Sequence, residues 1–94
     1  MIVWDERKRE ANLRKHGFDF ADGHLVYDNP EKITLPTPRD GERREMDLAF
    51  VEAIGTVLSL VYVSRAEDIR AISFRRASRT ERRLYERIRS EKQD

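Results

Sequence analysis

Hydrophobic and polar residues follow strand-like patterns over the middle of the chain. Residues 45–51 alternate, with Met46, Leu48 and Phe50 directed to one side, as a half-buried strand requires. Residues 57–63, VLSLVYV, are continuously apolar and β-branched, which is typical of a central strand covered on both faces. Shorter apolar runs predict further strands at residues 2–4, at an edge, and at residues 32–35 and 69–74.

Two helices are predicted near the N-terminus. Asp5 is suited to cap a helix by accepting a backbone N–H, and the helix should end at about His16 because Gly17 favours the left-handed conformation. A second, short helix should begin near Asp19. Its buried residues are expected to be Phe18, Ala21 and Leu25.

A third helix is predicted at the C-terminus. Residues 78–81, Ser-Arg-Thr-Glu, form a capping box, in which the serine and glutamate side chains each satisfy a free backbone N–H. The apolar stripe of this helix consists of Leu84 and Ile88, with Tyr85 beside it. Residues 90–94 are expected to form a frayed tail.

The order of these elements predicts the fold class. Strands joined by short turns, with helices before and after them, are typical of an α+β fold with one sheet. We therefore expect two N-terminal helices, a four-stranded, mainly antiparallel sheet and a C-terminal helix. At 94 residues the chain should be a single domain, residues 1–94.

Composition narrows the protein class. Apolar residues make up 38% and charged residues 39%, so the core is small and the surface heavily charged. The chain has no cysteine, which excludes disulfides and thiolate metal sites and fits a cytoplasmic protein. It has no apolar run near the ~20 residues needed to cross a bilayer, and its N-terminus does not resemble a signal peptide.

The net charge of +1 conceals an uneven distribution. Residues 17–63 hold four basic and nine acidic side chains, whereas residues 64–94 hold ten basic and six acidic ones. This asymmetry predicts a basic face and an acidic face. A basic face attracts either a polyanion or an acidic protein partner, and charge alone does not separate the two.

The sequence offers little support for a metal site, a phosphate-binding loop or a catalytic nucleophile. The two histidines, His16 and His24, lie on different predicted helices with no obvious third ligand, so no metal site is predicted. The four glycines form no phosphate-binding loop, and no nucleophile motif is present. No cofactor is predicted.

Arginine is the residue type that stands out. It keeps its charge at physiological pH, and its planar donors fit phosphate oxygens. Any single arginine is best interpreted as a partner in a surface ion pair, with Glu42, Glu45, Glu67 or Asp68 as the acid. The group between Phe74 and Arg89 is too dense for that interpretation. Its members include Arg75, Arg76, Arg79, Arg82 and Arg83.

Three further positions have a structural and a functional interpretation. Tyr85 is expected to pack its ring on the sheet, and the alternative is a stacking face for a base. Lys8, Asn12 and His16 share a helix face that is more simply a solvated surface than a basic contact. Arg70 and Arg75 are five residues apart, so they should point to opposite faces of a regular strand.

Three stretches together resemble a known family, two of them motifs and the third the strands that lie between these motifs. WDERKREANLRKHGFDF, at residues 4–20, resembles the WDxxKxxxNxxKHGxxF opening of the BrnT toxins. RAISFRRASRTERRLYE, at residues 70–86, is similar to their RIISARxAxxxERxxY close. One departure is Phe74, which stands where the family usually has a small residue. Phe74 either narrows a substrate groove or fills the core.

The resemblance implies a ribonuclease toxin of a type II toxin–antitoxin system with a compact RelE-like fold. It also implies a cognate ribbon-helix-helix antitoxin, a heterotetrameric complex, and operator DNA bound only through the antitoxin. The Arg44 strand and the VLSLVYVSR strand, at residues 57–65, stand where the family has strands between its two motifs. By position in these strands and in the second motif, the implied catalytic residues are Arg44, Arg65, Arg70, Arg75 and Tyr85. The residues expected to bind RNA are Arg76, Arg79, Arg82 and Lys8.

RNA carries its own nucleophile, the 2′-hydroxyl, so a site of arginines can promote cleavage without metal by positioning and charge stabilisation. On this hypothesis Arg75 and Arg44 stabilise charge, and Arg65 and Arg70 position the phosphate. Tyr85 stacks on a base or assists proton transfer. The alternatives are a non-catalytic nucleic-acid-binding domain and a decayed toxin that mainly docks an antitoxin.

Overall fold

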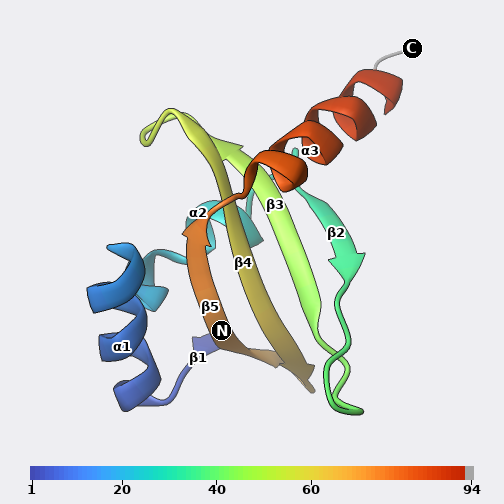
Figure 1. Cartoon of the computed structure of the whole chain (residues 1–94). Coiled ribbons are helices and arrows are strands. Elements are labelled where there is room, and N and C mark those ends of the chain that lie inside the picture. Colours follow the sequence, from blue (N-terminus) through green and yellow to red (C-terminus); the bar gives the residue numbers. More distant parts are fainter. Residues whose placement is uncertain (93–94) are drawn as a thin grey trace.

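A computed structural model describes residues 1–92 of the chain, with one sheet and helices on both of its faces (Figure 1). The strands occur in the order β1-β5-β4-β3-β2 across the sheet, with β1 parallel to β5 and the other pairs antiparallel. The elements are β1 (Ile2–Val3), α1 (Glu6–His16), the 3-10 helix η1 (Phe20–Asp22), α2 (His24–Tyr27), β2 (Ile33–Pro36), β3 (Glu45–Val51), β4 (Thr56–Arg65), β5 (Asp68–Arg76) and α3 (Arg79–Lys92).

The α+β class is confirmed, but the sheet has five strands where four were predicted. The additional strand is β1, which pairs with the start of β5 through Ile2 opposite Ile69. A backbone hydrogen bond from Ile69 to Met1 O, at 3.0 Å, extends this pairing. The apolar run at residues 2–4 predicted an edge strand, but it was not counted in the sheet because its partner lies more than sixty positions away in the sequence.

The first helix matches its sequence signals. The Asp5 side chain accepts hydrogen bonds from the backbone N–H groups of Arg7 and Lys8, at 2.9 and 3.2 Å. Gly17 ends the helix with φ = 79°, and its N–H donates to Leu13 O. A side chain would be strained in this left-handed conformation, which explains the glycine.

The second predicted helix is divided into two pieces. Asp19 caps η1 by accepting from Ala21 N at 2.9 Å, and the one-turn helix α2 follows. The predicted burial of Ala21 is wrong: Ala21 is exposed, while Phe20 and Val26 are fully buried. A 3-10 turn has three residues per turn instead of 3.6, so the buried face falls on different residues from those of a continuous α-helix.

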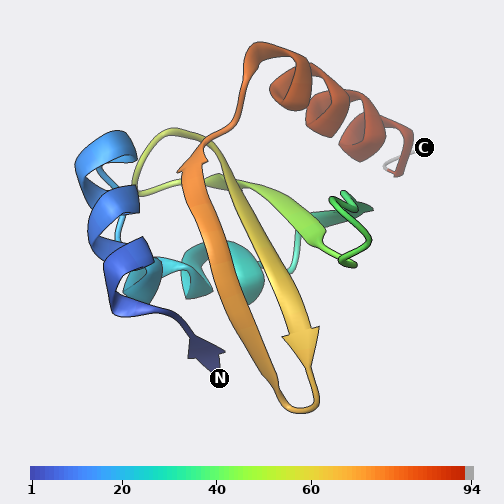
Figure 2. The same cartoon turned by 60° about the horizontal axis from the view of Figure 1, so that its bottom comes forward.

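The sheet has a separate core on each face. Figure 1 shows α2 behind the sheet and α3 across the upper front of it. The rear core packs residues of β4 and β5, such as Leu60 and Phe74, against Phe20 and Val26. The front core packs Leu48, Val57 and Ile33 around Tyr85 of α3. The lower front of the sheet is not covered by a helix (Figure 2).

Strand β3 is covered more fully than its alternating pattern predicts. Asp47, Ala49 and Val51 are buried against the rear core, whereas Phe50 on the front face is 47% exposed. The buried Asp47 accepts hydrogen bonds from Lys32 Nζ, Thr34 Oγ1 and Tyr62 Oη, at 2.8, 2.6 and 3.0 Å. Burial, and then the Asp47 carboxylate, raises the pKa of Tyr62 well above its usual value.

The C-terminal helix begins at the predicted capping box. Ser78 Oγ accepts from Glu81 N at 3.2 Å, and Glu81 Oε1 accepts from Ser78 N at 2.8 Å. The helix continues through residues 90–92, which were expected to belong to a frayed tail. Residues 93 and 94 of that tail lie outside the described residues.

Candidate functional site

The uncovered front of the sheet carries two arginines of β5, Arg70 and Arg75. Arg75 lies opposite Ser59 and Arg70 lies opposite Val63, and both of these β4 residues face the front. The expectation that Arg70 and Arg75 point to opposite faces is therefore wrong. Residue 72 is an extra residue in β5, because Ser73 pairs with Val61 while Ala71 pairs with Tyr62. This β-bulge shifts the alternation by one and brings both arginines to the front.

Arg44 and Arg75 line the same groove on this face. The groove has a volume of about 330 Å³, and its floor includes Val61, Ile72 and Ser73. Its wall is the segment between β2 and β3, which lies across the sheet from α1 (Figure 2). The residues that this segment contributes are Thr37, Pro38, Arg39 and Arg44.

Three of the predicted site arginines gather around one carboxylate. Glu42 accepts from Arg44 Nε at 2.7 Å and from Arg70 at 3.4 Å. The pKa of Glu42 lies below its usual value because of the Arg44 hydrogen bond first, and also because of the charges of Arg44, Arg70 and Arg65. The ion-pair interpretation of single arginines thus holds for Arg44 and Arg70.

Arg75 forms a two-point ion pair with Glu81 at the start of α3. Its two terminal nitrogens donate to the two carboxylate oxygens of Glu81 at 2.8 and 3.0 Å. This hydrogen bonding raises the pKa of Arg75 and lowers that of Glu81. Arg75 therefore holds α3 against β5 as well as lining the groove.

A second hollow adjoins the groove along β5. Lys8, Lys15 and His16 of α1 line a cavity of about 280 Å³ that shares Ile72 and Ser73 with the groove. The expectation that Asn12 lies on a solvated helix face is wrong, because Asn12 is buried and its hydrogen bonds hold α1 in this place. Its amide donates to Phe74 O at 2.8 Å and its carbonyl accepts from Phe74 N at 3.1 Å, so the side chain pairs with the edge of β5 as a strand would.

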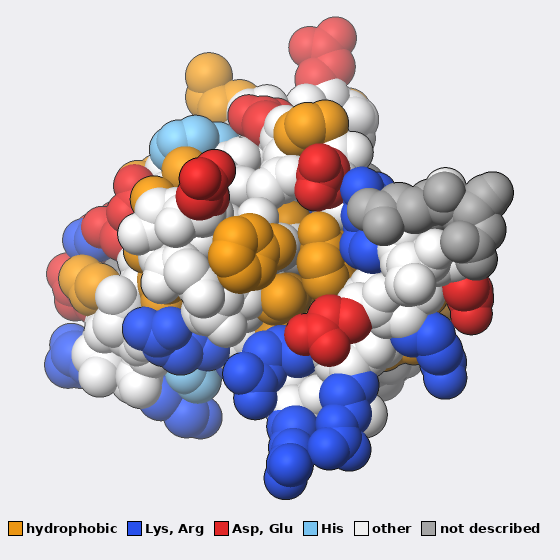
Figure 3. Space-filling model, turned by 90° about the horizontal axis from the view of Figure 1, so that it is seen from above, with side chains coloured by type: hydrophobic (Ala, Val, Ile, Leu, Met, Phe, Trp, Pro, Cys, Tyr) orange, Lys and Arg blue, Asp and Glu red, His pale blue; other side chains and the backbone are white. Residues whose placement is uncertain are grey.

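The basic residues border one side of the molecule. Seen from above, Lys and Arg side chains run along one side between α1 and α3, and most of the visible Asp and Glu side chains lie elsewhere (Figure 3). Arg79 and Arg82 are exposed on the first turns of α3, and Lys8 is exposed on α1. Arg76 lies with its guanidinium 5.6 Å from the ring centre of Phe18, on the face opposite Arg75.

Two residues from the motifs lie outside the groove. Tyr85 is 5% exposed in the front core, and its hydroxyl donates to Glu31 O at 3.0 Å. Its ring therefore packs on the sheet, as the structural interpretation expected. Phe74 is fully buried in the rear core, with its ring centre 5.3 Å from that of Phe18. It fills the core and does not narrow the groove.

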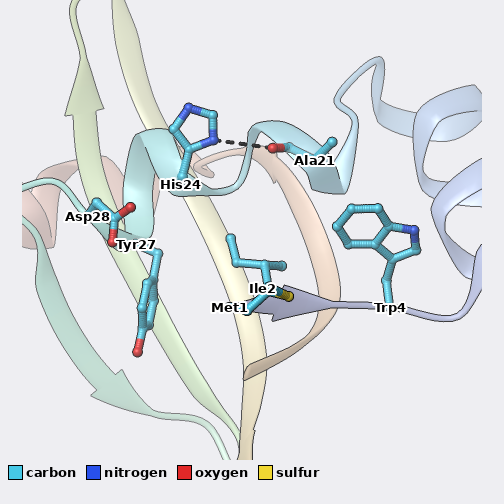
Figure 4. A pocket seen from close by; sticks show the side chains of 7 residues that line it. All are labelled: Met1, Ile2, Trp4, Ala21, His24, Tyr27 and Asp28. Atoms are coloured by element: carbon cyan, nitrogen blue, oxygen red, sulfur yellow. Dashed lines mark hydrogen bonds between the residues drawn. The ribbon is translucent and has the colours of Figure 1, made fainter. Parts of the chain in front are cut away.

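Another cavity lies on the rear side of the molecule. It has a volume of about 370 Å³, and its lining includes Trp4, His24 and Tyr27 (Figure 4). His24 Nδ1 lies 3.2 Å from Ala21 O, and Asp28 contributes a carboxylate to the lining. The charge of this carboxylate makes the cavity less suited to a polyanion than the arginine groove.

Carboxylates that organise the arginines were not predicted as site residues. Glu42 and Glu81 are ordinary surface acids in the sequence, and only the fold shows that they meet Arg44, Arg70 and Arg75. The capping-box spacing did identify Glu81, but as a helix cap alone.

Residues 1–92 contain no group of three or more Asp, Glu or His side chains placed to hold a metal ion.

A family model described as the ribonuclease toxin BrnT of type II toxin–antitoxin systems matches residues 4–81. The chain belongs to this toxin family. The match runs from Trp4, before α1, to Glu81 in the capping box, so it includes strands β2 to β5, the whole first motif and most of the second. No curated protein matches the chain.

Membership of the BrnT family has two direct consequences. The family is one of ribonuclease toxins, and a type II toxin has an antitoxin as its partner.

Within residues 1–92, none of the helices is both long enough and apolar enough to cross a membrane.

Proposed function

We propose that this BrnT chain is a metal-independent endoribonuclease that inhibits translation and growth in the cytoplasm. The observation that supports this most directly is the groove shared by Arg44 and Arg75. Strand β5 and the segment between β2 and β3 supply fixed positive charge to one concave surface, and the adjoining hollow adds Lys8 and Lys15. A phosphodiester backbone fits such a surface by charge and by hydrogen-bond geometry.

The proposed chemistry uses the 2′-hydroxyl of the RNA as the nucleophile. This oxygen attacks the adjacent phosphorus in line with the leaving 5′-oxygen, which gives a 2′,3′-cyclic phosphate and a free 5′-hydroxyl. Negative charge builds on the phosphate oxygens in the transition state, and arginine donors placed beforehand stabilise that charge. The guanidinium groups of Arg44 and Arg75 are assigned this role.

The remaining predicted residues have supporting roles in this proposal. Arg70 and Arg65, near Glu42, position the backbone at the end of the groove away from α3. Arg79, Arg82 and Lys8 extend the basic surface that holds flanking nucleotides, whereas Arg76 lies on the opposite face of the sheet, apart from this surface. Tyr85 would have to leave its hydrogen bond with Glu31 O to reach RNA, so a packing role is favoured for it.

The antitoxin is proposed to be a ribbon-helix-helix protein that forms a heterotetramer with the toxin. Operator DNA is then bound by the antitoxin alone. Support for this assignment comes from the type II family membership and from the motifs at both ends of the chain. Co-expression with the neighbouring reading frame tests it: the partner should co-purify and relieve growth arrest.

A second candidate function is RNA binding or antitoxin docking without cleavage. The ion pairs of Arg44 with Glu42 and of Arg75 with Glu81 favour it, because paired arginines have fewer free donors for phosphate. Incubation of the purified chain with RNA in excess EDTA separates the two functions. Cleavage products with cyclic phosphate ends support the nuclease, and binding without products supports the alternative.

A further inference from the structure

The ribonuclease proposed above lacks an obvious proton acceptor among its arginines. Attack by the 2′-hydroxyl requires that its proton leave, and the pKa of arginine is too high for it to act as a base near neutral pH. The hydroxyl of Tyr85 is buried and donates to Glu31 O. The chain has two histidines, and they lie on different sides of the molecule.

His16 lies beside the arginine groove. It is the last residue of α1, is partly buried, and lines the hollow that shares Ile72 and Ser73 with the groove. The position of His16 is set by Asn12, one turn earlier on α1, whose side chain is held to the backbone of Phe74 next to Arg75.

The charges around His16 are mostly positive. Lys8 and Lys15 line the same hollow from α1, and Arg75 acts on His16 from β5. The η1 turn packed against α1 carries Asp22, and the preceding Asp19 is paired with Arg9 at 3.0 Å. Among the described residues that line the hollow, none is a carboxylate.

This setting affects the protonation of the imidazole. Burial, the charge of Lys15 and the charge of Arg75 lower the pKa of His16 below its usual value. The imidazole is therefore largely uncharged at neutral pH, and an uncharged imidazole is able to accept a proton. The same positive groups attract the phosphate whose 2′-hydroxyl is to be deprotonated.

We propose that His16 is a catalytic residue that accepts the proton of the attacking 2′-hydroxyl. This inference rests on the proposed ribonuclease function. As the 2′-oxygen forms its bond to phosphorus, its proton moves to an imidazole nitrogen, and the bond from phosphorus to the 5′-oxygen breaks. The departing 5′-oxygen takes a proton from water, and the hydroxide so formed is neutralised by the imidazolium.

The test compares His16→Gln with the matched control His24→Gln. Single-turnover cleavage of an RNA is measured from pH 5 to 9, and binding is measured with the same sequence carrying a 2′-deoxyribose at the cleaved position. We expect the wild-type rate to rise with pH and level off near neutrality, because the base must be uncharged. His16→Gln should lower the rate by roughly 10²–10⁴-fold, the usual contribution of a general base, and flatten this rise.

The controls separate catalysis from folding and binding. His24→Gln should keep the wild-type rate and pH profile. His16→Gln should bind the uncleavable RNA with an affinity within about threefold of that of the wild type, because uncharged His16 adds little to phosphate attraction. A measurement on the unaltered chain covers the case in which His16→Gln fails to fold. The NMR signal of the His16 imidazole should titrate below the usual pKa of histidine, with the same midpoint as the pH dependence of the cleavage rate.

Each outcome has a distinct meaning. A wild-type rate and profile in folded His16→Gln, or a kinetic midpoint that differs from the titration of His16, overturns the assignment and leaves the ribonuclease proposal intact. Absence of cleavage by the wild-type chain at every pH overturns the ribonuclease proposal and this inference with it.

Discussion

Arg75 and Glu81 form a two-point ion pair that joins the end of β5 to the first turn of α3, with N–O distances of 2.8 and 3.0 Å. Glu81 also accepts the backbone N–H of Ser78, so one carboxylate serves the helix cap and the arginine. Arg75 thus has a structural role beside the catalytic role proposed for it. A loss of activity in an Arg75 variant is informative only when folding is measured in the same variant.

The ion pair should contribute to stability in a pH-dependent manner. The pKa of Glu81 is lowered by Arg75, so the contribution is present above the unfolded pKa of about 4.3 and is lost as pH falls through the folded pKa. Glu81→Gln should lower the free energy of unfolding by about 1–3 kcal/mol at pH 7. Urea denaturation at pH 7 and at about pH 3 measures this. The difference between wild type and variant should shrink at the lower pH.

Glu86→Gln is the matched control for this prediction, because Glu86 is exposed on the same helix. Its effect should stay within about 0.5 kcal/mol at both pH values. An effect of Glu81→Gln that is as small as this control, or one that does not depend on pH, contradicts a stabilising role for the Arg75–Glu81 pair.

Asn12→Ala should destabilise the fold by about 2–4 kcal/mol. The variant removes both hydrogen bonds to the backbone of Phe74 and one to Phe18 O, and it leaves polar groups unpaired in a buried place. Thermal or denaturant unfolding measures the change. Arg14→Ala, an exposed substitution on the same helix, should change stability by no more than about 0.5 kcal/mol. Equal effects of the two variants would show that Asn12 does not anchor α1.

Ser59→Ala should leave stability unchanged or raise it by up to about 1 kcal/mol. Ser59 is fully buried opposite Arg75, and its hydroxyl has no hydrogen-bond partner among the described residues. Removing an unpaired buried polar atom carries little or no loss. The neighbouring Leu60→Ala, in the rear core, should instead cost about 2–5 kcal/mol. A loss of more than about 1 kcal/mol in Ser59→Ala would indicate that the hydroxyl has a partner in solution.

Much of the fold was predictable because its signals are local. The cap at Asp5, the left-handed Gly17 and the capping box that begins at Ser78 each depend on residues within one helical turn. The continuous apolar run at residues 57–63 lies within β4, which has neighbours on both sides.

The parts that were not predicted depend on long-range pairing or on local irregularity. The bulge at Ile72 reverses the expected orientation of Arg70 relative to Arg75, and no residue type in β5 indicates it. The parallel pairing of β1 with β5 and the meeting of Glu42 with Arg70 join segments far apart in the sequence. The candidate arginines were therefore identifiable by the family motif, whereas their arrangement required the fold.

RNA binding by an Arg44 variant tests whether RNA lies in the groove. It lines the groove, and its ion pair with the partly exposed Glu42 lies at the surface. Arg44→Ala should weaken binding of an uncleavable RNA. It should also reduce the slope of log affinity against log salt concentration by about 0.7, the value expected for the loss of one phosphate contact. Arg14→Ala, exposed on α1 and outside both hollows, should leave the slope unchanged. An identical slope for wild type and Arg44→Ala would place the RNA elsewhere.

The central claim is that the arginine groove cleaves RNA without metal, and one assay tests it directly. Purified wild type and Arg44→Ala, both shown to be folded, are incubated with RNA in excess EDTA, and the product ends are analysed. We expect 2′,3′-cyclic phosphate products from the wild type and a rate at least about tenfold lower for Arg44→Ala, the equivalent of ~1.4 kcal/mol of transition-state stabilisation. No products from the wild type in EDTA, or equal rates for the two proteins, would contradict it.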